Sequence, residues 1–227
     1  MKVLLIEDEP QLSQDISEYL YKEKYLCEVV PNFEDANEKI NLYLYDCVIV
    51  DIGLPDGNGL DIIRSLKKNG SETGIIIISA KNSLDDKITG LEIGADDYLT
   101  KPFHLSELNA RIKSIIRRRS FGGANEIIFN EIRILPEQME AMVNSQSLGL
   151  TKKEYDLLIF FISNKERVLT REAIAEHLWG DQMDMADSFD FIYTHIKNLR
   201  KKIIDRGGED YIHTIYGMGY KFTEIPG

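Results

Sequence analysis

Residues 47–59, CVIVDIGLPDGNG, constrain the fold of this chain more than any other segment. The run starts with four apolar residues, which is typical of a strand buried on both faces of a parallel sheet. It ends at Asp51, and a glycine-rich loop follows at once. Open α/β sheets bind their ligands at the carboxyl ends of such strands. The alternative is that Asp51 only caps the turn. Residues elsewhere in the chain are needed to distinguish this from a ligand-binding role.

The first half of the chain alternates short apolar runs with segments of helical periodicity. Strands are expected at residues 2–6, 28–30, 47–51, 75–78 and 97–100. Helices are expected from Pro10 and over residues 33–43, 60–68, 85–93 and 105–118. This alternation predicts a flavodoxin-like (βα)5 domain over residues 1–119, an α/β fold with a parallel sheet in the order 2-1-3-4-5.

In that strand order, polar side chains from four strand ends share one edge of the sheet. They are Glu7, Asp8, Asp51, Ser79 and Lys101. Three close carboxylates repel one another, and a hard divalent cation such as Mg²⁺ relieves that repulsion. We therefore expect phosphoryl transfer, with Asp51 as nucleophile, Mg²⁺ and Lys101 neutralising phosphoryl oxygens, and Ser79 donating a hydrogen bond. A solvated loop charge is the alternative for each residue alone, but not for all five together.

These segments resemble the receiver domain of bacterial response regulators. The motifs that carry the resemblance are Glu7-Asp8, VDIGLPDGNG at 50–59, Ser79-Ala80 and GADDYLTKPF at 94–103. The resemblance implies that Asp51 accepts phosphate from a phosphohistidine of a sensor histidine kinase. It also implies that Mg²⁺ binds Asp8, Asp51 and the Gly53 carbonyl, with Glu7 assisting through water. Gly53 is a departure from the family, in which methionine is usual at that position.

Further roles follow only from this resemblance. Ser79 and Tyr98 correspond to a switch pair, in which the aromatic ring follows the hydroxyl inward, and the Lys101–Pro102 bond is expected to be cis. Phosphorylation is expected to promote a receiver dimer through the fourth helix, fifth strand and fifth helix. The expected pairs between subunits are Lys87–Glu107, Glu92–Arg118 and Asp97–Arg111. Ordinary charge on a solvated helix surface is the alternative for these pairs.

The pattern changes after residues 120–125, which we expect to form a linker. Short alternating runs over 126–149 predict a small antiparallel sheet. Thr151 and Glu154 predict a capping box at the start of a helix. Further helices are expected at 170–180 and 187–205, and a hairpin over 211–222. Three helices followed by a hairpin predict an α+β winged helix-turn-helix domain over residues 126–227.

The charge of this second domain has to be considered locally. The whole chain has a net charge of −11, and residues 126–227 hold 12 Lys and Arg against 17 Asp and Glu, which argues against nucleic acid. Residues 197–202, however, contain four cations and no acid. Helical spacing turns Ile192, Ile196, Leu199 and Ile203 inward and leaves Thr194, Lys197 and Lys201 on the opposite face, with Arg200 at its flank. This basic face suits the major groove of DNA; a solvated face is the alternative.

The second half of the chain resembles the effector domain of OmpR/PhoB-type regulators. The motifs are LTKKEYDLL at 150–158, LTREAI at 169–174, HIKNLRKKI at 195–203 and TIYGMGYKF at 214–222. The resemblance implies that helix 187–205 reads the major groove and that the hairpin is the wing. The residues expected at DNA are Thr194, His195, Lys197, Arg200, Lys201, Lys202 and Tyr216. Tyr216 stands where arginine is usual, and Tyr193 stands where aspartate is usual.

Together these patterns predict a phosphorylation-controlled transcription factor rather than an enzyme acting on other substrates. Its expected partners are a sensor kinase, direct-repeat promoter DNA, RNA polymerase and a second copy of the chain. A phosphohydrolase with an aspartyl-phosphate intermediate is one alternative, but Gly53 lies where its second acid is needed. The other alternative is a regulator that binds DNA without phosphorylation. The presence of the full set Glu7, Asp8, Asp51, Ser79 and Lys101 argues against it. A cytoplasmic location is expected, because no apolar run approaches about 20 residues and Cys27 and Cys47 suit reduced thiols.

Overall fold

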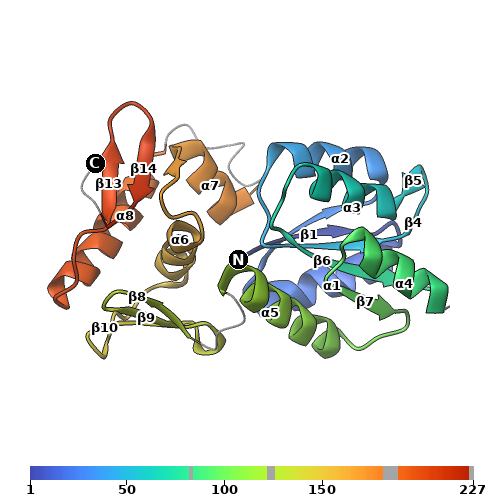
Figure 1. Ribbon diagram of the computed structural model, residues 1–227, viewed down its shortest axis with the longest axis horizontal. Helices are drawn as coiled ribbons and strands as arrows, with labels where there is room; N and C mark the ends of the chain where they lie inside the picture. The colour runs from blue at the N-terminus through green and yellow to red at the C-terminus, as the bar shows by residue number, and fades with distance from the viewer. Residues whose placement is uncertain (82–83, 122–125, 181–188, 225–227) are drawn as a thin grey trace. The chain divides into compact units, whose positions relative to one another are not determined.

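The computed structural model describes residues 1–81, 84–121, 126–180 and 189–224. The chain divides into two compact units, Met1–Arg119 and Ser120–Gly227 (Figure 1). Each unit has a hydrophobic core of its own. Within the described ranges, none of the helices combines the length and the apolar character needed to cross a membrane.

The first unit is built on a five-stranded parallel sheet. Its strands are β1 (Lys2–Ile6), β2 (Leu26–Val30), β3 (Cys47–Asp51), β6 (Gly74–Ser79) and β7 (Asp97–Thr100). Their order is β2-β1-β3-β6-β7, which confirms the predicted flavodoxin-like topology. Every residue of β1, β3 and β6 is buried, which explains why these strands are continuous apolar runs in the sequence.

The helices of this unit cover the sheet, α2 and α3 on one face and α1 and α5 on the other, with α4 packed against α3 and β7 (Figure 1). The helices are α1 (Pro10–Lys22), α2 (Phe33–Leu42), α3 (Gly59–Lys68), α4 (Leu84–Ile93) and α5 (Leu105–Phe121). Asn32 caps α2, because its side chain accepts a hydrogen bond from the Asp35 backbone N–H. Helix α5 continues to Phe121, beyond its expected end at Arg118. Residues 122–125 of the expected linker lie outside the described residues.

The loop after Asp51 contains a small hairpin that the sequence analysis missed. Strands β4 (Gly53–Leu54) and β5 (Gly57–Asn58) pair antiparallel there. A Cβ atom on Gly59 would lie only 2.0 Å from the Asp51 carbonyl oxygen, so the chain can return this close to β3 only with glycine at that position. A Cβ atom on Gly53 would meet its nearest neighbour, Asp51 Oδ1, at 3.8 Å, an ordinary contact. The backbone at residue 53 would therefore accept a side chain, so the structure does not require glycine where methionine is usual in the family.

The two cysteines lie on strands that flank β1. Cys27 of β2 and Cys47 of β3 both pair in register with Val3. Neighbouring strands are about 4.8 Å apart, so these Cα atoms are separated by roughly 9–10 Å. That separation exceeds the reach of a disulfide, and both thiols are free. Burial raises the pKa of Cys27 to about 12 and also raises the pKa of Cys47. Neither thiol is therefore a reactive thiolate.

In its described residues, the second unit contains two antiparallel sheets, three α-helices and a 3₁₀ turn over Pro136–Gln138. Strands β8 (Ile127–Phe129), β9 (Ile132–Leu135), β10 (Glu140–Val143) and β11 (Gln146–Ser147) form the predicted sheet in the order β11-β10-β9-β8. The helices are α6 (Lys152–Ser163), α7 (Arg171–Trp179) and α8 (Asp190–Asp205). The hairpin of β13 (Ile212–Ile215) and β14 (Gly219–Phe222) was expected, whereas β12 (Val168–Leu169), which pairs with β14, was missed. Residues 187 and 188, the expected start of α8, lie outside the described residues.

Local sequence signals set the ends and the buried face of these helices. The predicted capping box is confirmed, since Thr151 accepts a bond from the Glu154 N–H and the Glu154 carboxylate accepts one from the Thr151 N–H. The predicted inward stripe of α8 is also confirmed, and each of its residues is 1% exposed or less. These residues are Ile192, Ile196, Leu199 and Ile203. The opposite face of α8 is therefore left for solvent or a partner.

Candidate metal centre and nucleic-acid interface

Three carboxylates meet at the carboxyl edge of the parallel sheet. One oxygen each of Glu7, Asp8 and Asp51 lies within 4.8 Å of the others. The cluster forms because β1 and β3 are hydrogen-bonded neighbours, so the residues that follow and end these strands are adjacent in space. Glu7 and Asp51 are buried, whereas Asp8 is exposed. The juxtaposition expected from the strand order is present.

Lys101 joins two of these acids. Its Nζ lies 2.6 Å from Asp51 Oδ2 and 2.7 Å from Glu7 Oε2. The side chain comes from the end of β7, and the Lys101–Pro102 peptide bond is cis, as the resemblance implied. Burial alone lowers the pKa of Lys101, but its bonds to Asp51 and Glu7 outweigh this and hold the pKa above its ordinary value. Burial raises the pKa of Glu7, although Lys101 opposes the rise.

The charge and donor set of this cluster fit Mg²⁺. Three carboxylates and one ammonium leave a formal charge of −2 in a partly buried place, and hard oxygen donors are the ligands that Mg²⁺ prefers. The backbone of Gly53 is also close, since its N–H donates to Asp51 Oδ1 at 3.0 Å. In the part of the chain that the structure describes, this is the one group of three or more such side chains close enough to share an ion.

Ser79 and Tyr98 are connected through the backbone of Lys81. The Ser79 hydroxyl accepts a hydrogen bond from the Lys81 N–H at 3.1 Å, and the Tyr98 hydroxyl donates to the Lys81 carbonyl at 3.0 Å. Tyr98 is only 9% exposed. A Cβ atom on Gly90 of α4 would lie 3.2 Å from the Tyr98 ring, so the glycine leaves room for the ring. Burial raises the pKa of Tyr98.

The face formed by α4, β7 and α5 carries charge pairs and exposed apolar side chains. Arg111 lies 2.6 Å from Asp97 and 2.7 Å from Glu107, so both acids are paired within one chain. The pairing of Asp97 with Arg111 between subunits stays a prediction. The pairs Lys87–Glu107 and Glu92–Arg118 stay predictions as well. The sequence analysis missed the apolar part of this face, which has a spacing of four and three. It consists of Leu84 (71% exposed), Ile88 (43%) and Leu91 (46%).

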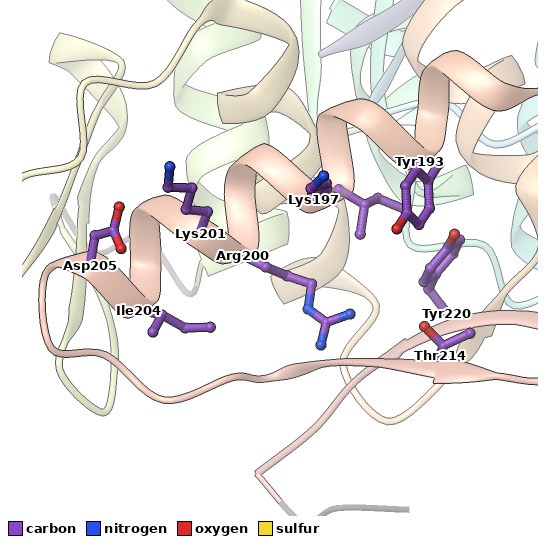
Figure 2. A pocket seen from close by; sticks show the side chains of 9 residues that line it. Tyr193, Lys197, Arg200, Lys201, Ile204, Asp205, Thr214 and Tyr220 are labelled. Atoms are coloured by element: carbon purple, nitrogen blue, oxygen red, sulfur yellow. The ribbon is translucent and has the colours of Figure 1, made fainter.

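On α8, the structure separates two kinds of basic residue. Thr194, Lys197 and Lys201 are exposed on the face opposite the buried stripe, as predicted. Arg200 is only partly exposed, and its guanidinium binds both oxygens of Asp210, with Nε 3.0 Å from Oδ1. Figure 2 shows Arg200 directed toward the hairpin, whereas Lys201 points away from it.

The other expected DNA contacts differ in exposure. Lys202 is engaged within the domain, 2.7 Å from the Glu154 carboxylate and 2.7 Å from the Gly149 carbonyl. His195 is half-buried, its ring centroid 5.4 Å from that of Trp179. Tyr216, in the turn of the hairpin, is 93% exposed. The basic cluster of the sequence therefore divides into side chains available to a partner and side chains that hold the domain together.

A groove of about 360 Å³ lies between α8 and the hairpin (Figure 2). The helix contributes cations to its wall, and both elements contribute tyrosines. It is lined by Tyr193, Ile196, Lys197, Arg200, Lys201, Ile204, Asp205, Thr214 and Tyr220. The sequence analysis did not identify Tyr220 or Ile204 as part of this surface, because only the folded domain places the hairpin beside the helix.

Comparison with known proteins gives consistent matches over both units. The family model described as response regulator receiver domain matches residues 3–113, and that described as transcriptional regulatory protein, C terminal, matches residues 145–222. The chain is similar to response regulator ArlR of Staphylococcus haemolyticus, with 37% identity over 96% of this chain and 97% of that protein. Two-component response regulator PhoP of Pseudomonas aeruginosa is 34% identical over 99% of each. The solved Francisella response regulator 1452 receiver domain is 34% identical, with a TM-score of 0.50, and covers 52% of this chain and 97% of its own.

Removing the cation partner of Glu7 should change how stability depends on pH. In Lys101→Met, the pKa of Glu7 should rise further, because burial still disfavours its charge and the ammonium that opposed this is gone. An acid whose folded-state pKa exceeds its unfolded value favours folding at low pH. The variant should therefore gain stability relative to the parent as the pH falls from 8 to 5, by about 1.4 kcal/mol for each unit of added pKa shift.

Calorimetric melting of the full chain in EDTA between pH 5 and 8 would measure this difference. Lys113→Met is the matched control, because Lys113 pairs with Glu23 at the surface, where its side chain is 55% exposed. The control should follow the parent. Parallel pH profiles for parent and Lys101→Met would contradict the assignment of Lys101 as the group that keeps Glu7 charged.

Proposed function

Because the chain belongs to the response regulators that join a receiver domain to a transcription-regulatory C-terminal domain, we propose that phosphorylation of Asp51 by a sensor histidine kinase promotes its binding to promoter DNA. We propose a receiver over residues 1–119, a connecting segment over 120–125 whose first two residues continue α5, and a winged-helix domain over 126–227. The observation that carries the proposal is the position of Asp51, a buried strand-end carboxylate 2.6 Å from Lys101 and next to Glu7 and Asp8. A cytoplasmic location and contact with RNA polymerase belong to the same proposal.

The chemistry at Asp51 follows from its neighbours. A carboxylate oxygen of Asp51 attacks the phosphorus of a phosphohistidine, so that a P–O bond forms as the P–N bond breaks. Bound Mg²⁺, held by Glu7, Asp8, Asp51 and the Gly53 carbonyl, would supply neutralisation of the phosphoryl charge. Lys101 is close enough to move its ammonium from the carboxylate to a phosphoryl oxygen, and the Ser79 hydroxyl can donate to another.

We infer that this unit catalyses only its own phosphorylation and dephosphorylation. A phosphohydrolase of this type needs a second acid two residues after the nucleophile, and Gly53 offers none. Gly53 is also exposed and would accept a larger side chain without a clash. Because glycine has no side chain, phosphorylated Asp51 would be more accessible to water than with methionine at position 53.

Asp51 is expected to be the sole phosphoacceptor. Incubation with a small-molecule phosphodonor and Mg²⁺ should add one phosphoryl mass to the intact protein. The addition should be absent in Asp51→Asn and in the parent treated with EDTA, because the nucleophile or the charge neutralisation is missing. Asp46→Asn, which changes an acid just before β3, is the matched control and should be labelled. Equal labelling of Asp51→Asn and the parent would refute the assignment.

We propose that phosphorylation favours a dimer through α4, β7 and α5. The exposed apolar row Leu84–Ile88–Leu91 supplies area that a partner can bury, and the charges around it fix the register more than the affinity. Asp97 and Glu107 already pair with Arg111 in the single chain. Dimerisation would therefore exchange or share these pairs rather than create them from free charges.

A charge reversal tests this interface. Lys87→Glu should weaken dimerisation of the phosphorylated protein, because it places an acid opposite Glu107 of the second copy. Lys87→Glu combined with Glu107→Lys should partly restore the dimer. Sedimentation velocity on the phosphorylated proteins would measure the dimer fraction, with Lys113→Glu as a control on the far part of α5. The interface lies elsewhere if parent, single and double variants dimerise equally.

We further propose that α8 of each subunit reads the major groove of a direct-repeat site. Lys197 and Lys201 are the cations of its exposed face, and no ion pair involves either within the described residues. Only two cations on the exposed face of α8, in a net-acidic domain, imply weak binding by one subunit, so pairing two subunits is what raises occupancy. This connects the phosphate at Asp51 to DNA, since phosphorylation supplies the pairing.

Two neighbouring lysines should behave differently. Lys201→Ala should cost about 1–3 kcal/mol on cognate DNA and relax sequence preference, because Lys201 is exposed on the reading face. Lys202→Ala should leave the preference unchanged but lower the free energy of unfolding by about 1–2 kcal/mol, since it removes the cation that pairs with buried Glu154. Titrations on cognate and scrambled duplexes, with thermal melting, measure both effects. If Lys197→Ala/Lys201→Ala binds both duplexes as the parent does, α8 is not the reader.

A further inference from the structure

Large apolar side chains are exposed on α8 and on the hairpin. Tyr193 (61% exposed) and Ile204 (49%) line the groove described above, and Tyr216 (93%) and Met218 (58%) lie at the tip of the hairpin. Tyr216 and Met218 stand on either side of Gly217 in the turn between β13 and β14. Two such side chains exposed together at the end of a hairpin offer apolar area that a partner can bury.

The turn that carries them is well defined. Gly217 and Gly219 have φ angles of +76° and +144°, which suit glycine, and the Met218 N–H donates to the Ile215 carbonyl at 3.0 Å. A Cβ atom on Gly219 would lie 2.1 Å from the carbonyl oxygen of Leu169, because β12 packs directly against β14. The two side chains are therefore presented from a hairpin that is anchored to the body of the domain.

The hairpin offers almost no free positive charge. Lys221 is the one Lys or Arg in residues 212–222, and its ammonium lies 2.9 Å from Glu166. On α8, Arg200 is held by Asp210 and Lys202 by Glu154. Whatever the hairpin tip binds, it binds with apolar surface rather than with charge.

The position of the tip follows from the groove, and this step rests on the proposed function. When α8 lies in the major groove, one phosphate backbone separates it from the neighbouring minor groove. Lys197 on one wall and Thr214 on the other give the groove of Figure 2 a cation and a hydroxyl that suit that backbone. The hairpin, which forms the second wall, then carries Tyr216 and Met218 to the minor groove.

We propose that Tyr216 and Met218 form an apolar wedge that enters the minor groove and partly unstacks one base step, bending the DNA. Apolar side chains inserted in this way are a known means of kinking a duplex. Pyrimidine–purine steps are the easiest to unstack, so the operator should carry one at the position of each hairpin tip. A stiff A-tract, whose narrow minor groove attracts arginine, should be disfavoured there.

The test uses the full-length protein, phosphorylated with a small-molecule donor, and a duplex that it selects from a random-sequence pool. Bending is measured by energy transfer between dyes at the duplex ends, and affinity is titrated at several salt concentrations. The variants are Tyr216→Ala, Met218→Ala, Tyr216→Phe and Tyr216→Arg. Tyr21→Ala, which removes a tyrosine that is 78% exposed on α1, is the matched control.

Tyr216→Ala should bind about tenfold more weakly, the loss of one aromatic stacking contact, with an unchanged salt slope and a loss of bending. Met218→Ala should show a smaller loss of the same kind, and Tyr216→Phe and Tyr21→Ala should match the parent. Tyr216→Arg should steepen the slope of log affinity against log salt by about 0.9. Bending retained in Tyr216→Ala would overturn the wedge, as would a salt slope that flattens by one phosphate contact. If the parent selects no duplex, the proposed function itself fails, and the wedge fails with it.

Discussion

Neighbouring parallel strands end at the same edge of a sheet, and in this chain the ends of β1 and β3 bring three carboxylates within 4.8 Å of one another. Such a cluster opposes folding unless positive charge compensates it. Lys101 supplies part of that charge from the end of β7, and its bonds to Asp51 and Glu7 raise its pKa in spite of its burial. One cation cannot balance three acids. The uncompensated negative charge favours a divalent cation, and under the function that we propose the site would accept a phosphoryl group only with that cation bound.

In the second unit, too, acids of the same domain pair with part of the positive charge. Four cations follow one another closely on α8, but Asp210 and Glu154 hold Arg200 and Lys202. Lys202 connects the last long helix to the capping box of α6, so a residue in a basic cluster acts as a bond between two helices. With fewer free cations on this helix, the DNA recognition that we propose would draw more on apolar contacts and on the pairing of subunits.

Motifs that act through neighbours in the chain were predicted well, as several elements show. The apolar run before Asp51 is a fully buried strand, Thr151 and Glu154 form their capping box, and the stripe from Ile192 to Ile203 faces the core. The two-residue strands β4, β5 and β12 were missed because so short a segment has no periodicity, and its strand conformation depends on its pairing partner. The end of α5 differed as well, since arginines that stabilise a helix terminus do not stop the helix.

The sequence alone determined the two domains' fold classes, the acids at the strand ends and the basic helix, because periodicity, the alternation of strands with helices, and charge runs are properties of consecutive residues. Only the tertiary structure decided which of those charges are free. Arg200 meets Asp210 ten residues later, Lys202 meets Glu154 48 residues earlier, and Lys101 meets Asp51 50 residues earlier. Distances of a few ångströms between segments so far apart in the chain are set by packing of the core. Whether a basic residue is free to contact a ligand or forms an ion pair within the domain therefore depends on which side chains the tertiary structure places beside it.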